Sequence, residues 1–514
     1  MHAAADGGLA RVRTPGGAVT ADQLRVVAAA ARELGSGVIE LTSRANLQVR
    51  GLPLPPDDSA AGGADGSAAD AGPGPSGSPD FATRMAAAGL LPSATHERVR
   101  NIVASPLAGR SPESRIDVRP LVADLDRELR ARPALASLPG RFLFALDDGS
   151  GDMAGLAADV TLLPVEPAAK PADVPRAEPE HPSGEASQVA LLLAGADCGL
   201  RAPVSAAVAG LLAVAEAFLA ERAEQGSGAW RLAELADGPD RVSARAALAE
   251  PLLRLSSASA VRPERTAGGR EAENPTWHIS ADTTGVTVTT GPGVVGVVAQ
   301  RDGRFALTVL APLGRLTPAQ AEALAQAADA GGGEVRVTPW RAIVIPDLPP
   351  SAVDESRARL TDAGLVGDPA SPWLGVTACA GRPGCAKARA DIHADIHADI
   401  HADIHADIHA AVHADVRAEV SSVESGPQAD GHADAGGSHH AGVAGDAVRS
   451  PSGDGGLLPA HWAGCERRCG RPRGRVVDVI AIGDGYRVEV DGVSRTFADA
   501  EQTSAAVAAT REGT

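Results

Sequence analysis

The pattern of apolar and polar positions occurs twice along the chain and predicts two copies of a strand–helix–strand unit. The segment LARVRTPGGAVT, residues 9–20, aligns without gaps with ALTVLAPLGRLT, residues 306–317. An alanine-rich stretch that is typical of a helix follows each segment. A strand-like stretch comes next, GVIELTSRANLQVRGLP in the first copy and GEVRVTPWRAIVIPDLP in the second. Because the similarity runs through three successive elements and their turns, it indicates a duplicated α+β unit.

Capping signals mark where the two predicted helices begin. Thr20 and Gln23 in the first copy, and Thr317 and Gln320 in the second, have the spacing of a capping box. In this motif the threonine side chain accepts from a backbone amide of the first turn, and the glutamine side chain reaches back to the threonine amide. The two helices are therefore expected to begin at equivalent positions.

The remaining patterns divide the chain into half-repeats, lobes and insertions. Strand-like segments lie at 98–108 and 141–147, helices at 206–222 and 351–364, and a hairpin-type ending at 476–497. Tracts rich in Gly, Ala, Ser, Asp and Pro favour disorder. The predicted organisation is half-repeat A, 1–53; a disordered insertion, 54–80; a first α/β lobe, 81–163 and 188–275; a linker, 164–187; half-repeat B, 276–349; and a second lobe, 350–514, interrupted by an insertion at 390–456.

Composition and charge narrow the class of protein. Aromatic residues make up only 2% of the 514, so the core must be built from Ala, Val and Leu. The net charge of -18 without a basic tract argues against a nucleic-acid partner. The opening MHAAADGGLARVR lacks the apolar region of a secretion signal, and no apolar run has the length of a membrane span. We therefore expect a cytoplasmic protein with no membrane partner.

Four of the five cysteines form two close pairs. Cys379 and Cys385 are a C-x5-C pair, and Cys465 and Cys469 are a C-x3-C pair. Four thiolates in two loops supply one ligand for each iron of a cubane iron–sulfur cluster. Structural zinc usually takes pairs separated by two to four residues, and disulfides need an oxidising compartment. The spacing thus favours a [4Fe-4S] cluster, and the lone Cys198 is expected to be a small buried hydrophobe.

A tetrapeptide repeat interrupts the second lobe. ADIH occurs five times over residues 390–409 and then decays into AAVH and ADVR. In a helix a period of four advances by about 40° per repeat, so the histidines would form a slowly turning stripe. Histidines at this spacing can share a metal, so a store of nickel, zinc or cobalt is one interpretation. We favour the other, an expanded repeat that lengthens a surface helix and continues into a disordered segment.

Half-repeat A is polar where half-repeat B is apolar. Arg11 and Arg13 are replaced by Thr308 and Leu310 in the second copy. If residues 42–50 form one strand, its alternating polar side chains share a face. These are Thr42, Arg44, Asn46, Gln48 and Arg50. Arginine forks on such a face suit a polycarboxylate, and the alternative is a face that meets only water.

The cysteine spacing resembles that of the nitrite and sulfite reductase superfamily, in which the cysteines hold a [4Fe-4S] cluster and the last one also bridges to sirohaem. The stretch LTSRANLQVRGL resembles the tetrapyrrole-binding strand of that superfamily. TACAGRPGC and HWAGCERRC resemble most one branch, the precorrin-3B synthases of aerobic cobalamin biosynthesis. The resemblance implies an α+β fold with two ferredoxin-like half-repeats about a pseudo-two-fold axis, each followed by an α/β lobe.

That branch implies an oxidoreductase that uses O2 to hydroxylate precorrin-3A and close a lactone. NADH would be the ultimate electron donor, acting through a separate electron-donating reductase. The cluster would pass electrons to a mononuclear non-haem iron. The acetate and propionate arms of the substrate would be held by polar residues of both half-repeats and of the first lobe. These are Arg11, Arg13, Arg44, Asn46, Gln48, Arg100, Arg141 and Arg341.

The alternative within the superfamily is a sirohaem-dependent nitrite or sulfite reductase, with Cys469 bridging to the haem. Arg100 and Arg141 stand where these reductases bind their anion. The second of the two basic positions used for sulfite is Leu143 here. This departure weakens the sulfite interpretation.

Overall fold

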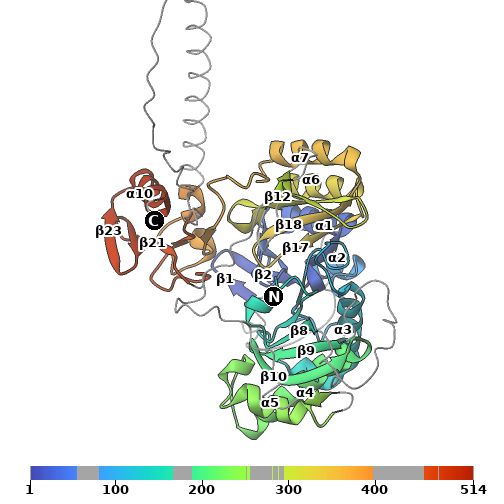
Figure 1. The fold of residues 1–514 in the computed structure, drawn as a ribbon. Helices are drawn as coiled ribbons and strands as arrows, with labels where there is room; N and C mark the ends of the chain where they lie inside the picture. Colours follow the sequence, from blue (N-terminus) through green and yellow to red (C-terminus); the bar gives the residue numbers. More distant parts are fainter. Residues whose placement is uncertain are drawn as a thin grey trace, which may run out of the picture. The chain divides into compact units, whose positions relative to one another are not determined.

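The computed structural model describes residues 2–54, 80–165, 188–249, 252–254, 280–281, 287–288, 295–396, 457–472 and 474–512. The chain divides into two compact units, 1–374 and 375–514, which Figure 1 shows as a blue-to-orange part and an orange-to-red part. Most of the expected insertion at 54–80, the linker at 164–187 and the insertion at 390–456 lies outside the described residues.

The two half-repeats in the first unit contain the same elements in the same order, and their mixed composition confirms the α+β class. Half-repeat A consists of β1 (His2–Ala4), β2 (Gly7–Val12), β3 (Ala18–Thr20), α1 (Ala21–Leu34), β4 (Ile39–Leu41) and β5 (Leu47–Leu52). Half-repeat B consists of β14 (Gly296–Ala299), β15 (Phe305–Leu310), β16 (Arg315–Leu316), α6 (Pro318–Asp329), β17 (Glu334–Val337) and β18 (Ala342–Leu348). The short strands β12 (Ser280–Ala281) and β13 (Thr287–Val288) extend the second sheet.

Each half-repeat gives one short strand to the sheet of the other. The sheet orders are β1-β2-β5-β4-β16 and β12-β13-β14-β15-β18-β17-β3. Within the aligned segment 9–20, a turn at Pro15–Gly17 separates β2 from β3. Gly17 lies in this turn at φ 71°, and a Cβ there would be 2.0 Å from the carbonyl oxygen of Val337. Glycine thus permits the close approach at which the strands are exchanged.

The helices α1 and α6 pack against each other in the hydrophobic core that the two half-repeats share (Figure 1). Both predicted capping boxes are confirmed, at Thr20 with Gln23 and at Thr317 with Gln320. The buried faces are mostly alanine, which lets the helix backbones lie close together. Arg25 of α1 forms an ion pair with Glu322 of α6 at 3.2 Å.

The second expected strand of each copy is a hairpin. In half-repeat A, β4 and β5 pair antiparallel around a turn in which Ala45 has φ 53°. In half-repeat B, β17 and β18 pair in the same way, with Arg341 at φ 64°. The prediction that residues 42–50 share one strand face by alternation is wrong, because Arg44 lies in the turn rather than in a strand.

The two α/β lobes have the same strand arrangement. The first lobe contains α2 (Phe81–Ala87), β6 (Ile102–Ala104), α3 (Arg119–Ala131), β7 (Phe144–Leu146), β8 (Val160–Val165), β9 (Gln188–Leu193), β10 (Ala196–Pro203), α4 (Ala207–Glu224), α5 (Gly238–Ala246) and β11 (Leu253–Arg254). In the first unit, α7 (Val353–Asp362) follows half-repeat B in sequence and packs against α6. The second unit contains β19 (Val376–Ala378), α8 (Gly381–Gly384), β20 (Ala460–Ala463), β21 (Val477–Ile482), β22 (Gly485–Val490), β23 (Val493–Phe497) and α10 (Ala500–Glu512).

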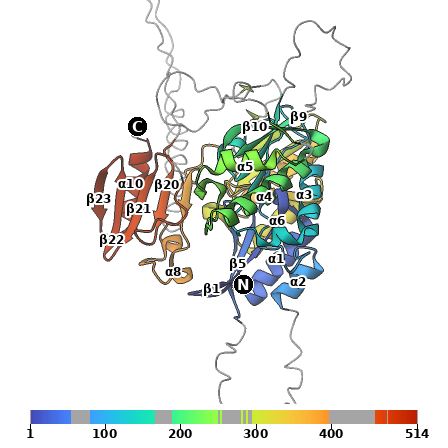
Figure 2. The same ribbon diagram turned by 90° about the horizontal axis from the view of Figure 1, so that it is seen from below.

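In each lobe three parallel strands are followed by an antiparallel hairpin and a helix. The parallel strands are β6-β7-β8 in the first lobe and β19-β20-β21 in the second. Figure 2 shows the sheet of the second lobe with α10 beside it. In the first lobe, α4 is long and apolar enough to cross a membrane, but half of its apolar window is buried inside the protein. We interpret α4 as a core helix.

Candidate functional site

The four paired cysteines lie in two loops at the ends of the neighbouring parallel strands β19 and β20. Cys379 follows β19 directly, and its amide donates to the carbonyl of Trp462 in β20 at 3.0 Å. Cys465 comes two residues after the end of β20. Carboxyl ends of parallel strands meet at one edge of a sheet, so the two loops lie side by side. The second loop is tied to β21, since Arg468 and Arg471 both pair with the buried carboxylate of Asp478, at 2.9 and 2.8 Å.

The electrostatics of Cys379 shows that three of the thiols are near one another. Burial raises the pKa of the Cys379 thiol, and the neighbouring Cys469 and Cys465 add to this effect. Hydrogen bonds act in the opposite direction, among them the one from the amide of Gly464 to Cys379 Sγ at 3.2 Å. Amide donors to a ligand sulfur are a feature by which proteins tune iron–sulfur clusters.

The thiols are not packed as the ligands of a single ion. Within the described residues, the group of three potential ligands that lie within 4.8 Å of one another is Asp147, Asp148 and Asp152, and it includes no cysteine. A cubane holds its thiolates at the corners of a larger body than one metal ion does. A donor set of four sulfurs, one for each iron, fits a [4Fe-4S] cluster.

The first lobe has a counterpart of the cysteine loops. Ser105 follows β6 as Cys379 follows β19, and its amide likewise donates to the neighbouring strand. The amide of Asp148 donates to Ser105 Oγ at 3.1 Å, which matches the bond from Gly464 to Cys379 Sγ. The two strand ends therefore share one geometry and differ in side-chain chemistry.

In the first lobe the equivalent side chains end in oxygen atoms, and these oxygens form hydrogen bonds within the loop itself. Asp147 accepts from four backbone amides of residues 149–154. Asp152 accepts from Ser105 Oγ at 2.5 Å, and burial together with the Asp147 carboxylate raises the pKa of Asp152 to about 8. The side chains of this counterpart that the structure describes are carboxylates and a hydroxyl rather than thiols.

The expectation that the whole ADIH repeat is a surface insertion is wrong for its first residues. Residues 392–396 form a helical turn inside the second unit. Ile392 is 0% and His393 is 6% exposed. The later copies, from His397 onward, lie outside the described residues.

The position of the first copy changes the deletion that tests the repeat. Removing residues 390–414 would remove buried side chains. Removing only residues 398–409 deletes three identical copies and keeps the sequence around Ile392 to Ile396. We expect this shorter deletion to leave iron content and turnover within a few-fold of the parent, because inserted segments are usually tolerated. Iron and sulfide assays on both deletions measure the difference, and equal losses in the two would contradict a special role of the first copy.

In half-repeat A, Arg11, Arg13 and Arg44 come together although the strand argument for Arg44 fails. Burial lowers the pKa of Arg13 to about 10, and the nearby Arg11 and Arg44 contribute to the shift. Burial also lowers the pKa of Arg44 to about 10, with Arg231, Arg11 and Arg141 as neighbouring positive charges. We call these five residues the arginine cluster.

The arginine cluster has donors that the described residues leave unused. The Arg44 guanidinium makes no hydrogen bond or ion pair among the described side chains, whereas Arg11 donates to Gln48 at 2.9 Å. Asn46 is 1% exposed, and its Nδ2 has no acceptor in the described part of the chain. Crowded positive charge and a buried orphan donor fit an anion with several carboxylates.

The other three predicted arginines differ in their surroundings. Arg100 is neutralised, since its guanidinium pairs with Asp126 at 2.6 Å and with Glu97 at 3.0 Å. Arg141 is exposed and stacks over the ring of Trp230 at 5.8 Å. Arg341, in half-repeat B, has its pKa lowered by burial and raised in part by Glu40. Of these three, only Arg141 belongs to the arginine cluster.

The sequence analysis missed Arg231 and Trp230. Arg231 approaches Arg44 and pairs with Asp159 at 2.7 Å, although 187 positions separate the two arginines. Both residues lie in the segment AWRLAELADG between α4 and α5, which has no motif and no counterpart in the repeat. Only the folded chain brings this segment to the arginine cluster.

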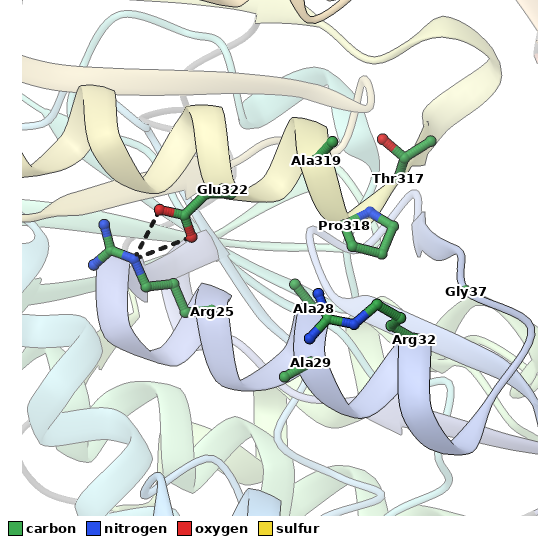
Figure 3. Close-up of a pocket in the computed structure, with 9 residues that line it drawn as sticks. All are labelled: Arg25, Ala28, Ala29, Arg32, Gly37, Thr317, Pro318, Ala319 and Glu322. Atoms are coloured by element: carbon green, nitrogen blue, oxygen red, sulfur yellow. Dashed lines mark hydrogen bonds and ion pairs between the residues drawn. The ribbon is translucent and has the colours of Figure 1, made fainter.

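A separate hollow lies between α1 and α6 (Figure 3). Its volume is about 740 Å³, and small apolar residues together with Arg25, Arg32 and Glu322 line it. None of the predicted site residues is among its lining residues. It is therefore distinct from the arginine cluster.

Comparison with known proteins concerns both the half-repeats and the fold of the whole chain. Residues 2–55 and 298–363 match the family model described as nitrite/sulfite reductase ferredoxin-like half domain. The structure of the Mycobacterium tuberculosis NirA protein is similar, with a TM-score of 0.59 and 19% identity over 96% of this chain and 78% of that one. The fold is therefore that of NirA, and the matched ranges identify ferredoxin-like half domains in this chain. They contain most of half-repeats A and B, and the second range continues through α7.

Relatives found by sequence carry nitrite reductase names. An assimilatory ferredoxin-dependent nitrite reductase of Haloferax mediterranei is 25% identical over 408 residues, which cover 74% of this chain and 61% of the relative. Ferredoxin–nitrite reductases of Leptolyngbya laminosa and Synechococcus elongatus are 31% identical over 142 and 147 residues, or 26% and 27% of this chain and 24% and 25% of those proteins. The chain thus spans less than two thirds of these relatives.

The relatives overturn the expectation of a precorrin-3B synthase. Their names indicate nitrite reduction rather than oxygen-dependent hydroxylation of precorrin-3A. The O2 substrate, the NADH-linked reductase and the mononuclear non-haem iron belonged to that interpretation and have no support. The resemblance of TACAGRPGC and HWAGCERRC to one branch was too short a signal to choose the reaction. The names of these relatives also describe oxidoreductases, of a different kind.

Proposed function

We propose that the chain is a sirohaem-dependent nitrite reductase that takes electrons from ferredoxin through a [4Fe-4S] cluster. The observation that carries the proposal is the pair of cysteine loops at the ends of β19 and β20. Cys379, Cys385 and Cys465 are partly buried there and Cys469 is exposed. An exposed fourth thiolate suits a ligand that also bonds a group outside the loop, as the superfamily resemblance implies for sirohaem.

The arginine cluster supports an anionic tetrapyrrole. Arg11, Arg13 and Arg44 would bind its carboxylates, and Asn46 Nδ2 would donate to the same group. Each pairing would relieve repulsion between neighbouring guanidinium groups, because a carboxylate placed among them supplies the missing negative charge. Bound sirohaem would supply the iron at which nitrite is reduced.

The residues near Arg141 favour nitrite over sulfite. Nitrite is a monoanion, whereas sulfite is a dianion in its fully ionised form and needs more positive charge to hold it. Arg141 supplies one cation, Arg100 is neutralised by Asp126 and Glu97, and Leu143 is 5% exposed in the core. Of these three anion-binding positions, only Arg141 offers a cation that no carboxylate neutralises, and a single cation there suits the smaller charge.

Spectra and turnover of the purified protein test this function. We expect haem absorption bands, an extractable tetrapyrrole, and nitrite consumption that depends on reduced ferredoxin, with sulfite turned over more slowly. The holoprotein with reduced ferredoxin is compared with the same protein given a chemical reductant, which separates the donor from the reaction. A protein that holds a cluster but releases no tetrapyrrole on extraction would contradict the proposal.

A further inference from the structure

The segment that follows the first cysteine pair crosses over both cysteine loops. We call residues 388–396 the strap. Its Arg389 amide donates to the carbonyl of Gly464 in the second loop at 2.8 Å. The carbonyl of Ala390 accepts from the amide of Arg382 in the first loop at 3.0 Å. The strap thus bonds to both loops through its backbone.

Side chains of the strap also fix it against the rest of the second unit. Ile392 is fully buried, and a Cβ on Gly381 would lie 2.7 Å from its Cγ1. Ile396 is 1% exposed, and the Asp395 carboxylate accepts from the hydroxyl of Tyr486 on β22. A short turn without these contacts would be marginal in water, so the contacts hold the strap in place.

His393 is the point at which the strap reaches a cysteine directly. Its Nε2 lies 2.9 Å from the carbonyl oxygen of Cys379. A carbonyl only accepts, so Nε2 carries the hydrogen in this bond. The side chain is buried, and losing the donor would leave the Cys379 carbonyl without this partner.

We propose that His393 is a positioning residue that fixes the Cys379 loop for the iron–sulfur cluster, and that the first ADIH copy is part of the cluster site. This inference rests on the cluster site proposed above. Groups that orient metal ligands without touching the metal commonly change its retention when they are replaced. His393 holds the backbone of Cys379 while Gly464 donates to its sulfur, so the ligand is fixed from two sides.

The test compares the same change in two places of an identical repeat. His393→Ala is made together with His397→Ala, so that the next copy cannot supply a histidine by slipping four residues. His405→Ala with His409→Ala is the matched control in the same tetrapeptides. We expect the first pair to lose the cluster to a chelator about 10- to 100-fold faster than the parent, and the control pair to match the parent. His393→Gln keeps an N–H donor and should restore part of the retention.

A second readout separates this inference from the proposed function. Amide hydrogen exchange of residues 379–389 is measured in the full chain with and without iron and sulfide. We expect faster exchange in the His393→Ala, His397→Ala chain under both conditions. A parent that takes up no cluster would refute the cluster site. Faster exchange in the metal-free variant than in the metal-free parent would still support the role of the strap. Unchanged exchange and unchanged cluster retention would overturn the role of His393.

Discussion

Replacing any one of the four paired cysteines by serine is expected to remove the cluster and the activity. A cubane needs one thiolate for each iron, and a serine hydroxyl is a much poorer ligand than a thiolate at neutral pH. Cluster iron and acid-labile sulfide should fall from about four each per chain to near zero in Cys379→Ser, Cys385→Ser, Cys465→Ser and Cys469→Ser. Iron analysis and the visible spectrum of the purified variants measure this loss.

Cys198→Ser is the matched control for the cysteine series. Cys198 lies in β10 of the first lobe and packs against the core of that lobe. We expect its replacement to leave iron, sulfide and turnover unchanged. If Cys198→Ser lost the cluster while one of the four paired cysteines proved dispensable, the ligand assignment would be wrong.

The second large effect is expected at Arg44. If its guanidinium binds a tetrapyrrole carboxylate through two parallel hydrogen bonds, Arg44→Lys keeps the charge and loses that geometry. We expect Lys to weaken binding of sirohydrochlorin to the metal-free chain by about 1.5–3 kcal/mol, the range for a hydrogen bond to a charged group. Arg44→Ala should weaken it more, because the carboxylate then lacks a partner. Titration followed by absorbance measures the affinities.

Arg127→Lys provides the control for Arg44. Arg127 lies on the exposed side of α3 and pairs with Asp124 at the surface, outside the arginine cluster. Its replacement should leave the affinity unchanged. Equal affinities of the parent, Arg44→Lys and Arg44→Ala would show that this region of half-repeat A binds no carboxylate.

Local signals in the sequence predicted those parts of the fold that depend on near neighbours. The capping boxes at Thr20 and Thr317 need only residues three positions apart, and both formed as expected. The gapless alignment of residues 9–20 with 306–317 likewise predicted the two half-repeats, and the family match over both ranges agrees with it.

The predictions that failed did so mainly because they depended on contacts with residues distant in sequence. Nothing near Gly17 indicates that β3 will pair with β17. The turn at Ala45 could not be recognised, because polar and apolar residues alternate through it as they would in a strand. Arg100 matched an anion-binding position, but Asp126 on α3 neutralises it, and that carboxylate has no signal in the strand itself.

The candidate site shows the same division. The cysteine spacing predicted the two loops that β19 and β20 bring together, because the ligand types carry their own chemistry. His393 was invisible as an individual residue, since its tetrapeptide is identical to the four that follow. A short resemblance around the cysteines also chose the wrong branch, because ligand loops report the cofactor more directly than the reaction.

The exchange of β3 and β16 between the half-repeats has a consequence for how the chain is made. β3 ends at Thr20, but its partner β17 ends at Val337, so the edge of the second sheet cannot be completed until more than 300 residues later have been synthesised. At about 5–20 residues per second this takes roughly 15–60 s. For that time β4 also lacks β16. A nascent chain in this interval exposes two unpaired strand edges, which can pair with other chains. Chaperone binding and the rate of translation are therefore expected to determine the yield of folded protein.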